Sequence, residues 1–359
     1  MKIEATYVQF DAVQKNSSTL SVEDNKVHCY VILRELLVSL SLISGIGAII
    51  FAVTLNPAFA TILIPSIALC ILGLSAQPNS VNKTPPPPTE PFVEGQPIGL
   101  KNGSCNCWIN AAMQLFIHTQ SYRDLIEDYQ EECKVIKNFI DAYEVSRQKQ
   151  LRVAVPTTQK IREWLHNDSN LGISKHAWEQ EDAIDFFNHL FSVTQYSLPI
   201  EQQVNNSGDW SKNTTHYIDI PLETGKKPAS FDQLMERFYY DKADPGTGNE
   251  VHVTKKFTSA PNAVLMYLRR FNNIDGVLGK YTEQVPVPME ITLSDSSYHV
   301  TGFIEHSGTS HKGGHYYCYL LKEGIWWKCN DASVTKATEK QLQAAMSRAY
   351  IYNFTKSEN

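Results

Sequence analysis

The sequence predicts an α+β domain that follows a transmembrane helical hairpin. Three stretches of the 359-residue chain carry this prediction. Residues 36–82 contain no charged side chain, and an Asn-Pro pair divides most of them into two apolar limbs. Residues 107–116 have apolar positions at helical spacing, whereas residues 313–331 form two aromatic, β-prone arms around a Lys-Glu-Gly turn. The chain is long enough for one large domain and an appendage.

Residues 31–77 are predicted to form the transmembrane hairpin, after a flexible tail at residues 1–30. The limbs 36–55 and 57–76 each reach the roughly 20 apolar residues that a spanning helix needs. A charge-free break at a proline suits a tight reversal between them. A buried pair of core helices is the alternative, but neither limb has a polar face to orient it against a soluble core. A cleaved signal peptide is disfavoured because the apolar region is too long.

This bilobed hairpin resembles the inclusion-membrane proteins of chlamydiae and related intracellular bacteria. The resemblance is architectural and carries no motif, and an ordinary membrane hairpin of a eukaryotic enzyme fits the same residues. It implies a bacterial effector located in a host-cell or inclusion membrane.

Residues 78–94 are predicted to be a linker between the hairpin and a domain at residues 95–355. Four successive prolines lie at its centre, so the segment is extended and stiff. At about 3.1 Å per residue it holds the domain up to roughly 60 Å from the bilayer. Flanking charges are too few to fix the orientation of the hairpin.

Composition excludes some functions. The net charge of -6 lacks the basic bias of a protein that neutralises phosphates, so we expect no nucleic-acid partner. Seven cysteines are spread along the chain without any Cys-x-x-Cys pair. This spacing favours a reducing compartment over a disulfide framework, and it predicts neither a zinc site nor any other cofactor. We therefore expect the domain to face the cytosol.

Cys107 is the candidate nucleophile. It lies at the start of the predicted helix, where free N–H groups and the helix dipole favour the thiolate. Asn102, in the preceding loop, is placed to donate its side-chain amide to an oxyanion. Cys105 is a competing nucleophile, and a cysteine near a helix start is more often inert packing.

His315 and Asn330 are the candidate base and its partner. If the turn centres on Lys322-Glu323, residue 315 lies opposite residue 330, whereas a shift of one residue pairs 315 with 332 and still leaves the two close. A histidine base needs such a partner to hold its tautomer. The chain order Cys, His, Asn is that of papain-like proteases. A surface hairpin with an incidental histidine is the alternative.

Residues 95–355 resemble the ubiquitin-specific proteases, the papain-like deubiquitinases. The family's Cys box is matched by Gly99, Leu100, Asn102, Cys107, Trp108, Asn110 and Gln114. Its His box is matched by Gly314, His315, Tyr316, Tyr319, Trp326, Asn330, Asp331, Ser333 and Val334. Residues 179–187, 261–271 and 298–308 resemble three further family motifs in the expected order.

The resemblance implies a papain-like right-hand fold. A helical thumb carries Cys107, a β-rich palm carries His315 and Asn330, and shortened fingers span about residues 205–256. It implies that Asn102 is the oxyanion donor, with Asp331 as the acidic neighbour that supports the oxyanion. Residues 103–106 depart from the family's pattern, which leaves the loop geometry open. Because the family's zinc-binding cysteine pairs are absent, the fingers are expected to be held by packing alone.

The resemblance also implies residues that bind ubiquitin. They are Asp182, Asp185, Gln180, Tyr316 and Gly314. The apolar positions of residues 178–191 share one helical face, so Asp182 and Asp185 are predicted to share a different, exposed face. A solvated polar face is the plain alternative. In the family, the matching acidic positions receive arginines of ubiquitin, one of them in its Arg-Leu-Arg-Gly-Gly tail.

The implied activity is thiol-dependent hydrolysis of the peptide or isopeptide bond after the C-terminal glycine of ubiquitin. Ubiquitin, ubiquitinated proteins and the membrane are the implied partners. Three alternatives remain open: an isopeptidase for another ubiquitin-like modifier, an inactive ubiquitin-binding scaffold at a membrane, and a membrane-organising protein.

Overall fold

The computed structural model describes residues 93, 95–174, 176, 179–205, 207–222, 230–243, 251–274, 277–310 and 313–358. The chain divides into two compact units, residues 1–89 and 90–359, and every described residue belongs to the second. The predicted tail, hairpin and most of the linker therefore lie outside the described residues. Within the described part of the chain, no helix is long and apolar enough to cross a membrane.

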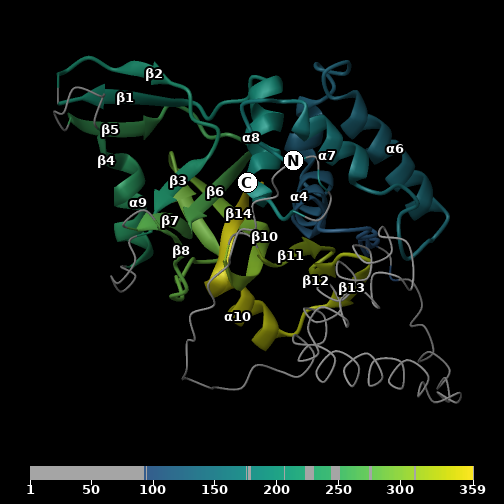
Figure 1. The fold of residues 1–359 in the computed structure, drawn as a ribbon. Helices are drawn as coiled ribbons and strands as arrows, with labels where there is room; N and C mark the ends of the chain where they lie inside the picture. Colours follow the sequence, from purple (N-terminus) through teal and green to yellow (C-terminus); the bar gives the residue numbers. More distant parts are fainter. Residues whose placement is uncertain are drawn as a thin grey trace, which may run out of the picture. The chain divides into compact units, whose positions relative to one another are not determined.

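The N-terminal half of the described chain forms a helical thumb (Figure 1). Its helices are α4 (Cys107–Ile117), α5 (Gln120–Leu125), α6 (Lys134–Gln148), α7 (Gln159–His166) and α8 (Ala183–Val193). Every residue of α4 is buried, because this helix lies between α8 and the neighbouring sheet. The helix begins at Cys107, as the sequence predicted.

The palm is a sheet with the strand order β13-β12-β11-β10-β14-β6-β3, and β9 pairs with one end of β10. All of its pairings are antiparallel except that of β3 with β6. The strands are β3 (Ile218–Pro221), β6 (Ala263–Arg269), β9 (Glu290–Leu293), β10 (Ser296–Ser310), β11 (Gly313–Lys322), β12 (Ile325–Asn330), β13 (Ser333–Lys336) and β14 (Ala349–Lys356). A separate hairpin pairs β7 (Phe271–Ile274) with β8 (Val277–Lys280).

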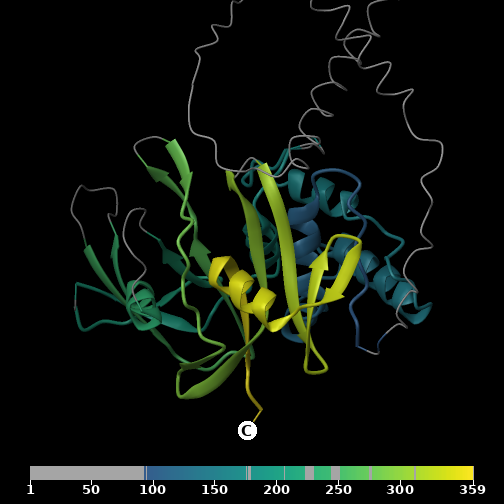
Figure 2. The same ribbon diagram turned by 90° about the horizontal axis from the view of Figure 1, so that it is seen from below.

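Both faces of the palm sheet are buried. Along β10, Phe303 packs with the helices α9 (Phe231–Tyr239) and α10 (Glu339–Arg348), whereas its neighbour Ile304 packs with the thumb. Figure 2 shows α10 against the sheet on the side away from α4. Successive side chains of a strand point to opposite faces, so a sheet covered on both sides needs continuous apolar runs. This explains the run Ala-Val-Leu-Met at the start of β6.

The fingers are a small antiparallel sheet of β1 (Ile200–Val204), β2 (Ser211–Asn213), β4 (Tyr240–Ala243) and β5 (Val251–Phe257), in the order β2-β1-β5-β4. Phe257 packs against Phe238 of α9, with ring centroids 6.0 Å apart. Two ion pairs, Lys255–Asp241 and Lys256–Glu201, also cross the sheet. The fingers are therefore held by ion pairs as well as by the packing that we expected. Such partly exposed pairs contribute at most about 1 kcal/mol each to the free energy of unfolding.

Candidate active site

The turn of the β11–β12 hairpin sets the geometry of the site. Glu323 and Gly324 both have positive φ, 49° and 71°, and they connect the paired residues Lys322 and Ile325. This is a two-residue turn of the kind that matches strand twist. Extending the register places His315 opposite position 332. Of the two registers that the sequence allowed, the hairpin therefore adopts the one with its turn at Glu323-Gly324.

His315 and Asn330 nevertheless meet, as diagonal neighbours on one face of the hairpin. His315 Nε2 lies 2.7 Å from Asn330 Oδ1. Because an amide oxygen can only accept, Nε2 carries the proton and donates it in this bond. The Nδ1 lone pair of His315 then remains available to take a proton from a thiol. The hairpin therefore holds the tautomer that a general base requires.

The Asp331 carboxylate contacts three other residues of the site. Its Oδ2 accepts a hydrogen bond from Asn102 Nδ2 at 2.9 Å, and its Oδ1 accepts one from Asn110 Nδ2 at 2.7 Å. His315 Nε2 lies 3.6 Å from Asp331 Oδ2. The backbone of Asp331 has a φ of 49°, which turns the chain sharply between β12 and β13. One carboxylate thus orients the predicted oxyanion donor and stands beside the predicted base.

Asn102 is fixed on both sides of its amide. Its Oδ1 accepts hydrogen bonds from the backbone N–H groups of Ser104 and Asn106, both at 3.2 Å. Because the oxygen is fixed this way, the Nδ2 group must point toward Asp331. One of its two hydrogens is engaged there, and the other is available for an oxyanion.

The segment before the cysteine loop, Gly99 and Leu100, is held against the β12–β13 turn. The Leu100 N–H donates to the carbonyl of Asp331 at 2.8 Å. A Cβ on Gly99 would lie 2.3 Å from the carbonyl oxygen of Ala332, a distance that no side chain tolerates. Glycine at position 99 is therefore required for the close approach that brings Asn102 to Asp331.

Cys107 is the first residue of α4 and is only 3% exposed. Burial raises the pKa of its thiol to about 12, and hydrogen bonds from the backbone N–H groups of Tyr316 and Trp108 act in the opposite direction. Among the described residues, Cys107 and His315 are not hydrogen-bonded to each other. The Trp108 N–H at the helix start therefore favours the thiolate, as expected, but desolvation outweighs it and the net pKa of the thiol is raised. Free enzymes commonly align such pairs only when substrate binds.

Cys105 has no comparable surroundings. Its side chain is half-buried, and burial raises the pKa of its thiol, whereas the Arg162 charge lowers it. The Tyr316 N–H beside Cys107 belongs to the residue that follows His315. The structure therefore places Cys107, and not Cys105, next to the histidine.

Asp182 and Asp185 are not on an exposed helical face, so that prediction was wrong. Helix α8 begins only at Ala183, because the Asp182 side chain caps it by accepting from the Ile184 N–H at 3.1 Å. Both carboxylates are half-buried. Desolvation raises the pKa of both, and the charge of Asp182 raises that of Asp185 further. Asp182 also accepts from the Tyr350 hydroxyl at 3.0 Å.

The other predicted ubiquitin-binding residues surround His306. Gln180 Nε2 lies 3.0 Å from His306 Nε2, and the Tyr316 ring lies 4.6 Å from that imidazole. Gly314 has a φ of 156°, and a Cβ there would lie 2.3 Å from His306 Nε2. Tyr316 itself is buried, so it supports this side of the site through packing.

The sequence motifs assigned no role to two residues that build this site, Asn110 and Lys280. Asn110 lies one helical turn after Cys107, bonds Asp331, and accepts from Thr158 Oγ1 at 2.7 Å. That spacing was the available signal. Lys280 donates to the carbonyl oxygens of His306 and Gly308, both at 2.7 Å. Nothing in the sequence indicated the role of Lys280.

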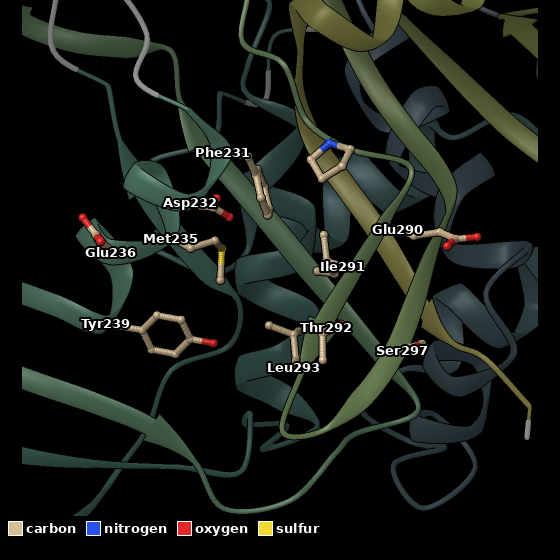
Figure 3. Close-up of a pocket in the computed structure, with 11 residues that line it drawn as sticks. Phe231, Asp232, Met235, Glu236, Tyr239, Glu290, Ile291, Thr292, Leu293 and Ser297 are labelled. Atoms are coloured by element: carbon tan, nitrogen blue, oxygen red, sulfur yellow. The ribbon is translucent and has the colours of Figure 1, made fainter.

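A groove of about 660 Å³ lies away from these residues (Figure 3). It opens between α9 and β9 and is lined by side chains such as Phe231, Met235, Glu290 and Leu293. None of the predicted site residues lines it. A smaller cavity of about 210 Å³ borders the site and is lined in part by Lys280, His306 and Gly308.

The helical thumb, the β-rich palm and the candidate Cys-His-Asn set agree with the cysteine hydrolase that the sequence motifs predict. The family profile described as "Ubiquitin carboxyl-terminal hydrolase" matches residues 98–354. The chain therefore belongs to the ubiquitin carboxyl-terminal hydrolase family, as the sequence motifs predicted.

Individual relatives agree with this placement. The chain is 30% identical over 293 residues to ubiquitin carboxyl-terminal hydrolase 11 of Schizosaccharomyces pombe, covering 70% of this chain and 81% of that protein. It is 23% identical over 325 residues to ubiquitin carboxyl-terminal hydrolase 25 of Arabidopsis thaliana, covering 73% and 48%. The chain spans about half the length of several of the curated relatives it matches.

Solved structures show the same fold. The chain is similar, with a TM-score of 0.55 and 14% identity, to a chain in the structure titled "Structure of the SAGA Ubp8/Sgf11/Sus1/Sgf73 DUB module bound to ubiquitin aldehyde". The match covers 73% of this chain and 70% of that one. A chain in the structure titled "Structure of the Ubp8-Sgf11-Sgf73-Sus1 SAGA DUB module" matches with a TM-score of 0.52 and 18% identity. This match covers 73% of this chain and 68% of that one.

Proposed function

We propose that the protein is a cysteine deubiquitinase that hydrolyses the peptide or isopeptide bond after the C-terminal glycine of ubiquitin. His315 Nδ1 takes the thiol proton of Cys107, and the thiolate attacks the glycine carbonyl. The free Nδ2 hydrogen of Asn102 stabilises the oxyanion. His315 then protonates the leaving amine, and water attacks the thioester with His315 again as base.

One observation carries this proposal: Asp331 contacts both the candidate oxyanion donor and the candidate base. It bonds the oxyanion donor Asn102 and stands 3.6 Å from His315, whose tautomer Asn330 fixes. A ubiquitin-binding scaffold has no use for this arrangement. Cys107 is buried beside Tyr316, which favours an enzyme whose nucleophile is activated only when substrate aligns the histidine.

Ubiquitin is favoured as the modifier by Asp182 and Asp185. Their described hydrogen bonds come from Ile184, Tyr350 and Asn188, and no basic side chain in the described part of the chain pairs with either carboxylate. Two crowded carboxylates without a cation are suited to receive an arginine side chain, which bonds a carboxylate through two N–H groups. The arginines of the ubiquitin tail are such cations.

The modifier is tested with electrophilic probes built on ubiquitin and on other ubiquitin-like modifiers, applied to the full chain in mild detergent. We expect Cys107 to be labelled by the ubiquitin probe at least tenfold faster than by the others. Faster labelling by a probe built on another modifier would show that this modifier, and not ubiquitin, is the preferred substrate. No labelling by any probe would favour the scaffold.

We also propose that residues 31–77 anchor the protein in a membrane, with the domain in the cytosol. The absence of charge between residues 36 and 82 supports the anchor, and the unpaired cysteines support a reducing compartment. The test is protease protection of intact membranes: the domain should be digested without detergent. If the domain is protected until detergent is added, it faces the lumen and the proposed orientation is wrong. The resemblance to chlamydial inclusion-membrane proteins concerns the same residues and stays a prediction.

A further inference from the structure

Arg162 lies in the middle of α7, and its guanidinium is fully buried in the thumb. One set of partners belongs to the cysteine loop. Its Nη1 donates to the carbonyl of Cys105 at 3.3 Å and to Asn106 Oδ1 at 3.0 Å. The guanidinium also lies 5.8 Å from the centre of the Trp108 ring. Arg162 therefore contacts the residues on both sides of Cys107.

A second set of partners leads to the acidic residues proposed to bind the ubiquitin tail. Arg162 Nε donates to the carbonyl of Ser174 at 3.1 Å, and Nη2 donates to that of Glu179 at 2.6 Å. Glu179 directly precedes Gln180, and Asp182 follows two residues later. One rigid, planar group thus holds the nucleophile loop and the tail-binding segment in a fixed relation.

Stability alone does not explain a buried charge at this position. Taking a guanidinium out of water is costly, and a well-packed apolar side chain is often as stabilising or more so. The nearest carboxylate, Glu181, lies 4.0 Å away, so no close ion pair compensates the charge. Burial lowers the pKa of Arg162, and the charges of Glu181, Cys105, Glu179 and Cys107 act in the opposite direction. The Arg162 charge in turn lowers the pKa of Cys105, and its attraction for the Cys107 thiolate is weaker than the effect of burial on that thiol.

We propose that Arg162 is a positioning residue of the active site, which aligns Cys107 with the tail-binding segment and stabilises the thiolate. This inference rests on the proposed deubiquitinase function. Because it concerns the reactivity of Cys107 as well as turnover, one of its readouts does not depend on ubiquitin.

The test compares Arg162→Met with Arg162→Lys in the full chain. Methionine removes the charge and all donors, so we expect kcat/KM for a ubiquitin amide to fall about 100-fold, the usual effect of misplacing a reacting group by about 1 Å. The pH profile for alkylation of Cys107 by iodoacetamide should move to higher pH. Lysine keeps the charge but cannot bond both segments, so the profile should stay near that of the wild type while KM rises.

Arg270→Met is the matched control. Arg270 is also buried, and it donates to four carbonyl oxygens, those of Ala349, Tyr281, Glu283 and Ser347. None of these belongs to the cysteine loop or the tail-binding segment. Arg270 lines the small cavity beside Lys280 and His306, so the control is read from stability and thiol reactivity and not from turnover. We expect a comparable loss in Tm and an unchanged alkylation profile when all variants are assayed well below their Tm.

Asn106→Ala provides a second variant if Arg162→Met fails to fold. It removes the side-chain acceptor on the cysteine loop and leaves in place the buried charge and the bonds to the carbonyl oxygens of Cys105, Ser174 and Glu179. We expect a lower kcat with an unchanged KM.

The outcomes separate the two proposals. If Arg162→Met behaves like Arg270→Met, or if Asn106→Ala leaves kcat unchanged, Arg162 is only structural and the inference is wrong. If the wild type does not cleave ubiquitin substrates but its alkylation profile still depends on Arg162, the proposed function fails and the thiolate part of the inference stands.

Discussion

Asp182→Asn separates the two tasks that the structure gives to Asp182. The side chain caps α8 through the Ile184 N–H and is proposed to receive an arginine of ubiquitin. Asparagine is as good an N-cap as aspartate, so the helix start is preserved. Only the charge is lost. Asp182→Ala would remove both functions and cost about 1 kcal/mol of stability through the cap alone.

The expected change in KM follows from one charge-assisted contact. A hydrogen bond to a charged group contributes about 1.5–3 kcal/mol. Asp182 is half-buried, so we take the lower end, which corresponds to a rise in KM of about tenfold. Stability should move the other way. Burial raises the pKa of this carboxyl, so ionisation is unfavourable in the folded state, and the Tm of Asp182→Asn at neutral pH should equal or exceed that of the wild type.

The pH dependence has a defined sign. Because the folded-state pKa of Asp182 lies above its unfolded value, the folded state binds more protons between the two values. Stability contributed by this group therefore increases as pH falls through that window, and the charge that binds arginine is lost. We expect the KM of the wild type to rise toward pH 5, and that of Asp182→Asn to rise less.

The assay measures kcat and KM on a ubiquitin C-terminal amide and on a short Gly-Gly peptide amide without arginines. The peptide should respond little to Asp182→Asn. Asp232→Asn, in the first turn of α9, is the control and should change neither substrate. An equal loss on both substrates would mean that the helix is disturbed. No loss on either would show that Asp182 is only a cap.

Four further predictions follow from the site and the chain. Cys107→Ala should abolish hydrolysis, whereas Cys105→Ala should leave it largely intact. The reverse pattern would show that Cys105 is the nucleophile. His315→Ala should be nearly as severe, whereas Asn330→Ala should keep measurable activity because it only orients the base, and equal losses would contradict that role. Chelators should change neither activity nor Tm, and stoichiometric zinc by metal analysis would refute this. The full chain should resist alkaline extraction while a fragment from about residue 90 is soluble and active; an insoluble fragment with an extractable full chain would exclude the hairpin.

The helix start and the aromatic hairpin were predictable because local signals specify them. The turn formers before Cys107 and the apolar positions after it require a helix that begins there, and tertiary packing only buries it. The arms at residues 313–331 are β-prone over their whole length. Their register was ambiguous by one residue, because both Lys322-Glu323 and Glu323-Gly324 can form the turn. Positive φ at Glu323 decides it, and no sequence pattern shows that angle.

The exposure of the acidic residues and the net pKa of the thiol could not be predicted for a shared reason: both depend on the surroundings supplied by distant elements. The helical pattern continues upstream of Asp182, so the cap was read as part of the helix. Burial between elements distant in the sequence then raises its pKa, although the hydrogen bonds from the Ile184 N–H and the Tyr350 hydroxyl act in the opposite direction. The helix terminus alone favours a Cys107 thiolate, but the palm covers the thiol and reverses that preference. Residue type and spacing do not report burial of this kind.

The most direct test of the central claim is labelling of the full chain with a ubiquitin electrophile, followed by peptide mapping. We expect a single adduct on Cys107, which is lost in Cys107→Ala, retained in Cys105→Ala, and formed much more slowly in His315→Ala. An adduct on Cys105, or labelling of Cys107 that does not depend on His315, would contradict it.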